Sequence, residues 1–79
     1  MSWTAARLRG LWVLGAEGTA IVSASPVGYA VTPAAAGFLI RQGYARERTR
    51  IGGRRVIGIT RAGVDAYFRC CTERTDPVA

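Results

Sequence analysis

The sequence predicts a small α+β domain, mostly α-helical, in which one β-hairpin separates the helices before it from a single helix after it. Two observations predict this fold. Apolar residues recur at helical spacing near both ends of the chain, and a Gly52-Gly53 pair lies between two stretches that can pair as strands. The 79 residues allow one domain with a small core, which we assign to residues 1–74, and residues 75–79 are expected to form a frayed tail.

The first helix is expected over residues 2–16. One face of that stretch is apolar at the i, i+3, i+4 and i+7 spacing of a helix, and its members are Leu8, Leu11, Trp12 and Gly15. The helix is expected to end within the glycine-flanked residues 15–18. Residues 19–31 give conflicting signals, because residues 19–23 fit either a short helix or a β-branched strand and residues 25–28 have the composition of a turn.

Two further helices have clear start signals. Thr32 can accept hydrogen bonds from the free N–H groups of a helix that begins at Pro33, where the missing proline N–H costs nothing. This helix is expected to run to Gln42 and to stop at Gly43. Thr60 is expected to cap the last helix, whose apolar stripe would comprise Val64, Tyr67, Phe68 and Cys71.

Arginine dominates the hairpin region and gives the chain its charge. The chain carries eleven arginines, no lysine and five acidic residues, for a net charge of +6. Seven of the arginines and one acid lie between Arg41 and Arg61. So much positive charge on a short ribbon repels itself unless an anionic partner lies against it, and nucleic acid is the commonest such partner. The alternative is a solvated hairpin whose arginines only keep an edge strand soluble.

The register of the hairpin depends on which face its charged side chains occupy. A two-residue Gly52-Gly53 loop would place Arg50 opposite Arg55 and mix charged with apolar side chains on one face. A three-residue loop of residues 51–53, with Gly53 left-handed, would place Arg50 opposite Arg54 and separate the two sets. The separated sets are the exposed Arg46, Arg48, Arg50 and Arg54, and the inward Ala45, Ile57 and Ile59. We therefore expect the three-residue loop.

Composition argues against several classes of function. The chain has no histidine and its five acids are scattered, so a zinc site, a Ser-His-Asp relay and a paired-carboxylate mechanism all lack components. We expect no enzymatic activity and no cofactor. The longest apolar run, residues 11–16, is far shorter than the roughly 20 residues that span a bilayer, so we expect a cytoplasmic protein without a membrane partner. The adjacent Cys70 and Cys71 are expected to be free structural thiols, with Cys71 packed inward and Cys70 more exposed.

The order of these motifs resembles a winged helix–turn–helix domain, most closely the MarR/PadR type of transcriptional regulator. The resemblance rests on a helix that opens at Thr32-Pro33 and closes Leu39-Ile-Arg-Gln-Gly43, on the basic hairpin, and on Ile59-Thr60-Arg-Ala-Gly63 after it. It covers residues 32–68 well and the first 31 residues loosely. The resemblance implies three helices, a β-hairpin wing and a C-terminal helix.

The resemblance also implies that the helix of residues 32–42 enters the major groove of double-stranded DNA while the wing follows the phosphates or enters the minor groove. The residues expected to contact DNA are Thr32, Arg41, Gln42, Arg46, Arg48, Arg50, Arg54, Arg55 and Arg61. The first turns of that helix offer almost no side chain that could hydrogen-bond a base edge, so phosphate contacts are expected to dominate.

The expected assembly is a monomer or a small homodimer formed through Trp3, Tyr67 or Phe68, because neither terminus has room for a long dimerisation helix. Two other functions stay open. One is a winged-helix module that docks its Ala-rich helix and its arginines on an acidic partner protein. The other is a basic protein associated with RNA or the ribosome.

Overall fold

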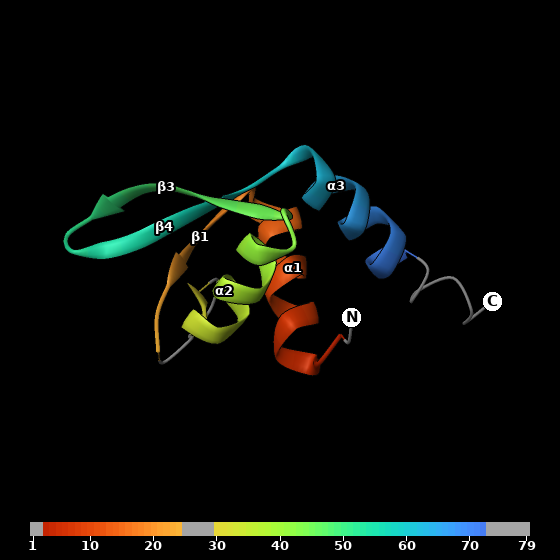
Figure 1. Cartoon of the computed structure of the whole chain (residues 1–79), viewed down its shortest axis with the longest axis horizontal. Helices are drawn as coiled ribbons and strands as arrows, with labels where there is room; N and C mark the ends of the chain where they lie inside the picture. Colours follow the sequence, from red (N-terminus) through yellow and green to blue (C-terminus); the bar gives the residue numbers. More distant parts are fainter. Residues whose placement is uncertain (1–2, 25–29, 73–79) are drawn as a thin grey trace.

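The computed structural model describes residues 3–24 and 30–72, and these form an α+β domain (Figure 1). The elements in chain order are α1 (Ala5–Glu17), β1 (Thr19–Val22), β2 (Ala30–Val31), α2 (Pro33–Arg41), β3 (Ala45–Ile51), β4 (Arg54–Ile59), α3 (Arg61–Tyr67) and a π-helical turn, η1 (Phe68–Thr72). The α+β class is confirmed, but among the described residues two α-helices rather than three precede the last helix, and the hairpin belongs to a four-stranded sheet that was not predicted. The tail expected for residues 75–79 and the helix start expected at residue 2 lie outside the described residues.

Threonine caps set the starts of all three α-helices. Thr4 accepts a hydrogen bond from the backbone N–H of Arg7 at 3.2 Å, so α1 begins at Ala5 rather than at residue 2. Thr32 and Thr60 cap α2 and α3 in the same way, as predicted. The end of α2 is also close to the prediction, because its last residue is Arg41 and Gly43 follows with a φ of 81°.

The ambiguous stretch after α1 forms a strand. β1 pairs antiparallel with β4 and parallel with β2, so it lies inside a four-stranded sheet of order β2-β1-β4-β3. Ala20 and Val22 face inward and are buried, whereas Thr19 and Ile21 are exposed. Of the two structures that residues 19–23 allowed, the structure shows the strand, with one face buried and the other exposed. The turn expected at residues 25–28 lies outside the described residues.

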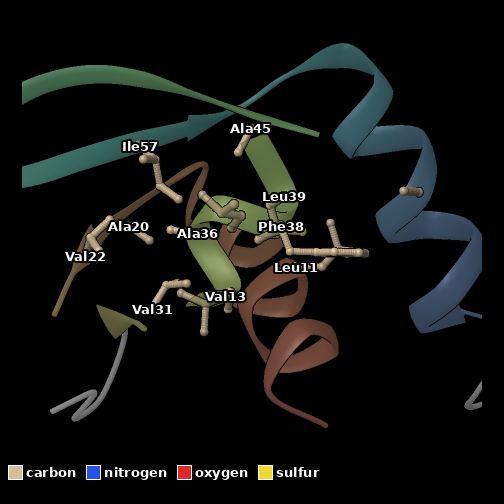
Figure 2. Close-up of a cluster of buried hydrophobic side chains, with 13 residues drawn as sticks. Leu11, Val13, Ala20, Val22, Val31, Ala36, Phe38, Leu39, Ala45 and Ile57 are labelled. Atoms are coloured by element: carbon tan, nitrogen blue, oxygen red, sulfur yellow. The ribbon is translucent and has the colours of Figure 1, made fainter. Parts of the chain in front are cut away.

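The core lies between α1, α2 and the inward face of the sheet. Its largest fully buried side chains are Leu11, Leu14, Leu39, Ile57, Val13 and Val31. Figure 2 shows Ile57 and Ala45 pointing from the strands toward the helices, where Phe38 and Leu39 of α2 lie near Leu11 of α1. The β3–β4 hairpin extends beyond the helices, on the opposite side of the domain from α3 (Figure 1). The core therefore anchors the base of the hairpin and leaves its distal half projecting.

The predicted register of the hairpin is wrong. Gly52 and Gly53 both have positive φ, 58° and 79°, and form a two-residue loop, so Arg50 lies opposite Arg55 and not opposite Arg54. The left-handed Gly53 was predicted correctly. A β-bulge at Arg48, between the pairs formed by Glu47 and Thr49, shifts the register in mid-strand. The bulge, and not a longer loop, places Arg46 and Arg48 on the opposite face from Ile57 and Ile59, while Glu47 lies on the same face as these isoleucines.

The outcome for individual side chains follows from this register. Ile57 is fully buried as predicted, whereas Ile59 is only half-buried. Arg46, Arg48, Arg50 and Arg54 are all exposed as predicted, but Arg50 does not share a face with the other three, because the bulge shifts the alternation before it.

The predicted apolar stripe on the last helix is confirmed for Tyr67 and wrong for Val64 and Phe68. Tyr67 packs half-buried against the core together with the buried Gly63 and Ala66, while Val64 and Phe68 are exposed. A Cβ atom at Gly63 would collide with the carbonyl oxygen of Tyr44, so α3 approaches the chain too closely for a large side chain. Cys70, within the π-helical turn, packs half-buried against the core, and its greater exposure relative to Cys71 stays a prediction. The side chain of Cys71 lies outside the described residues.

Candidate nucleic-acid interface

The hairpin has two faces of different character, which we call the inner and the outer face. The inner face continues the side of the sheet that carries Ile57 and packs on the helices. Because side chains alternate along a strand and Arg48 is an extra residue, the register assigns Glu47, Arg50 and Arg55 to the inner face. The outer face of β3 and β4 comprises Arg46, Arg48, Thr49, Ile51, Arg54, Val56 and Gly58.

The charge of the inner face is partly compensated. Arg55 donates from Nε to both carboxylate oxygens of Glu47 at 3.1 Å and from Nη2 to Oε1 at 2.7 Å. These hydrogen bonds, with smaller Coulombic contributions from Arg55 and Arg50, hold the pKa of Glu47 below its ordinary value. Glu47 therefore offsets the repulsion between Arg50 and Arg55, which face each other across the strands. This compensation is why the two-residue loop tolerates that like-charge pair.

The outer face carries three exposed arginines without such compensation. Within residues 3–24 and 30–72, the side chains of Arg46, Arg48 and Arg54 form no ion pair and no hydrogen bond. No described helix covers this face, since Ile21 and Ile51 on it are 41% and 66% exposed. The outer face is therefore a basic surface open to a partner.

Arg48 lies in a fixed place on that surface. A Cβ atom built on Gly58 would lie 2.8 Å from Cγ and 2.9 Å from Cδ of Arg48, so the aliphatic part of this arginine rests directly on the Gly58 backbone. Arg46 is the paired residue opposite Gly58 on one side, and Thr19 of β1 is opposite it on the other. The Arg48 stem thus runs over the middle of the sheet at a position that only glycine leaves open.

The other predicted DNA contacts are dispersed. The Thr32 hydroxyl accepts from the Ala35 N–H, so it serves as a helix cap. Arg41 folds back along α2, since a Cβ atom at Gly37 would lie 3.6 Å from its Nη1. Gln42 lies at the exposed end of α2, and Arg61 is the exposed first residue of α3. The structure therefore brings the hairpin arginines together but adds only single side chains from the helices.

Arginines of α1 contribute to the fold itself. The guanidinium of Arg7 lies 4.1 Å from the centre of the Phe38 ring, in a cation–π contact. The Trp3 ring meets Phe38 edge-on at 5.4 Å and stacks on Tyr44 at 5.9 Å. Arg9 donates to the backbone oxygen of Ala30 at 2.8 Å. These contacts fasten α1 to α2 and β2, so the net positive charge of the chain is not all available for binding.

Sequence reasoning missed the bulge, the Glu47–Arg55 pair and the role of Gly58. A glycine inside a predicted strand is a signal for a bulge or a close approach, and Gly58 carried that signal. No group of three metal-ligating side chains occurs among the described residues. Their helices are also too short or too polar to cross a membrane. The chain matches no protein family, no curated protein and no solved structure in the comparisons made.

Proposed function

We propose that this protein is a small winged-helix DNA-binding protein, a transcriptional regulator or an accessory factor, which holds duplex DNA chiefly through phosphate contacts from the β3–β4 hairpin. The observation that carries the proposal is the group of Arg46, Arg48 and Arg54, exposed together on one face without an acidic neighbour bound to them. Guanidinium groups match phosphate geometry and stay charged at every physiological pH.

The order of elements supports the winged-helix part of the proposal. Helix α1 is followed by a strand, then by helix α2, and then by a hairpin whose second strand pairs with the first strand of the chain. The structure differs from a winged helix–turn–helix domain at β2, because this strand precedes α2 at the place where the resemblance implies a helix. The hairpin part of the proposal is independent of that departure, because it depends on charge and exposure alone.

The surface of α2 indicates that the protein would discriminate only weakly between DNA sequences. The exposed side of this helix presents Pro33, Ala34 and Gly37, and only Arg41 adds a long polar side chain. Base discrimination requires donors and acceptors that reach base edges, and phosphate contacts alone supply none. We therefore expect similar affinity for unrelated duplex sequences.

An NMR titration tests the proposal. Isotope-labelled protein is mixed with a duplex of mixed sequence at two salt concentrations, and the backbone amides that shift are identified. We expect shifts concentrated in β3 and β4 that shrink at the higher salt concentration. The absence of shifts at both salt concentrations would contradict the proposal.

The small side chains on the exposed side of α2 favour a second candidate function, that of a module that docks on an acidic protein. Small side chains let another backbone approach closely, and Ile40 adds a half-buried apolar residue beside them. In the titration, this candidate predicts no response to DNA. With an acidic protein partner, it predicts shifts in α2 together with the hairpin.

A further inference from the structure

The β-bulge determines the face on which Arg48 lies. In an unbroken strand counted back from the Gly52-Gly53 loop, Arg48 would pair with Ile57 and lie on the inner face. As the extra residue it turns to the outer face and lies over Gly58, next to the outward Arg46. Bulges commonly redirect a side chain in this way. The result is a concentration of positive charge on the outer face.

We infer that the outer face of the hairpin is the side that holds the phosphate backbone of duplex DNA, and that Gly58 is a positioning residue that holds Arg48 there. This inference rests on the proposed function and specifies its partner and its geometry. The outer face offers three uncompensated guanidiniums from Arg46, Arg48 and Arg54, whereas the inner face offers Arg50 and an Arg55 already bound to Glu47. An anion gains more on the outer face, because no internal ion pair has to be broken there.

Charge and side-chain chemistry identify duplex DNA as the partner. Single-stranded nucleic acid is held by aromatic side chains on which the bases stack. The outer face of β1, β3 and β4 has no aromatic residue, and its members are Thr19, Ile21, Arg46, Arg48, Thr49, Ile51, Arg54, Val56 and Gly58. Arginines and threonines on an open sheet can contact a charged backbone without unstacking its bases.

Gly58 acts through Arg48 and not through the fold. The atoms that an added Cβ would meet are the flexible Cγ and Cδ of Arg48, so the sheet can keep its shape while the arginine moves away. Gly58→Ala should therefore remove the same phosphate contact as Arg48→Ala. In protein that already lacks Arg48, the alanine at position 58 has nothing to displace.

The test compares variants of the full chain binding to a mixed-sequence duplex over a range of salt concentrations. Arg54→Ala and Arg55→Ala form a matched pair, because they remove the same charge from adjacent residues on opposite faces. We expect Arg54→Ala to weaken binding by up to about five-fold. Its log affinity should also become less steep against log salt by about 0.9, the contribution of one phosphate contact. Arg55→Ala should leave the slope unchanged. An Arg55→Ala effect equal to or larger than that of Arg54→Ala would overturn the inference.

The positioning role of Gly58 is tested by the set Arg48→Ala, Gly58→Ala and the double variant. We expect Arg48→Ala and Gly58→Ala to lower the affinity by the same factor and to make log affinity less steep against log salt by the same amount. The double variant should bind no more weakly than Arg48→Ala alone. Additive losses, or a loss of thermal stability in Gly58→Ala with an unchanged salt slope, would show that Gly58 is only structural and overturn this part.

Two further outcomes separate the possible failures. Wild-type protein that does not bind duplex DNA would overturn both the proposed function and this inference. Wild-type binding with equal contributions from both faces, or tighter binding to a single strand of equal length, would overturn only the inference.

Discussion

Glu47 binds Arg55 at 2.7 Å on the inner face of the hairpin, diagonally across the strands. Arg50 lies directly opposite Arg55, so without the carboxylate two guanidiniums would face each other unscreened. The single acid of the hairpin therefore offsets the repulsion between these two arginines and leaves Arg46, Arg48 and Arg54 without an ion pair among the described residues.

Replacing Glu47 with glutamine should strengthen the binding of duplex DNA. The change removes the one negative charge of the hairpin and so weakens the repulsion of the phosphates, while the number of outer-face phosphate contacts, and therefore the slope of log affinity against log salt, should stay the same. Asp65→Asn is the matched control, since it removes the same charge from the exposed surface of α3, away from the hairpin. Fluorescence anisotropy with a labelled duplex measures both. Equal gains in the two variants would show that only net charge matters.

The Glu47–Arg55 pair should also give the hairpin a specific dependence on pH. The hydrogen bonds from Arg55 lower the pKa of Glu47 from its ordinary value of 4.5 in the folded protein. The pair therefore stabilises the fold above pH 4.5 and loses this contribution as the pH falls through the lowered pKa. Thermal unfolding of wild type and Glu47→Gln should differ at pH 7, and the difference should shrink toward pH 3. A difference that is constant over this range would contradict the assignment.

Replacing Gly53 with valine should destabilise the protein by about 1–2 kcal/mol or more, because a β-branched residue cannot easily adopt a left-handed conformation. The φ of Gly53 is 79°. Gly37→Ala is the control, since Gly37 lies in α2 with ordinary helical φ and an added Cβ would touch only Arg41 at 3.6 Å. That change should stabilise by about 0.5–1 kcal/mol. Denaturant unfolding measures both, and a harmless Gly53→Val would exclude the two-residue loop.

Replacing Gly63 with alanine should cost about 1–3 kcal/mol, the usual range for an overpacked contact. The added methyl group would collide with the backbone carbonyl of Tyr44 and with the half-buried Ile59 side chain, and the backbone there cannot move freely. Exposed Ala62 is the neighbouring control, and Ala62→Ser should change stability by less than about 0.5 kcal/mol. Chemical denaturation of the two variants would detect the contrast, and equal stabilities would argue against the close docking of α3.

Replacing Cys70 and Cys71 together with serine should leave DNA binding unchanged under reducing and oxidising conditions. Cys70 packs half-buried against the core as a small apolar group, so a modest loss of stability is expected from its replacement. Binding assays with and without oxidant measure the effect. Wild-type binding that switches with oxidant, in a way the double variant has lost, would identify the protein as a thiol sensor.

Local chemistry in the sequence was sufficient to predict the helix starts, the glycine turn and the exposed arginines of the hairpin. Thr32 and Thr60 signal their caps through residue type alone, and Gly53 signals its positive φ. The register could not be predicted in the same way, because it depends on a bulge at Arg48 in β3, and the residue type at that position does not signal an extra residue. The face of α3 that packs inward was also beyond local pattern, since close backbone approach at Gly63 overrides the burial of larger side chains.

The candidate site likewise has a part that local residue types predict and a part that depends on strand pairing. Charge density in residues 41–61 indicated an anionic partner, and the exposure of Arg46, Arg48 and Arg54 agrees with that indication. Which arginines are compensated depends on the register, because Glu47 reaches Arg55 only across paired strands. The sequence therefore identified the region of the candidate site and three of the arginines that share its outer face, but it placed Arg50 on the wrong face.

The salt dependence of duplex DNA binding by the wild-type protein tests the central claim most directly. Three outer-face arginines with a contribution from Arg50 or Arg41 should give a slope of about −3 to −4 for log affinity against log salt, with little difference between unrelated sequences. A slope near zero, or binding confined to one sequence, would contradict the claim that hairpin arginines hold the phosphate backbone.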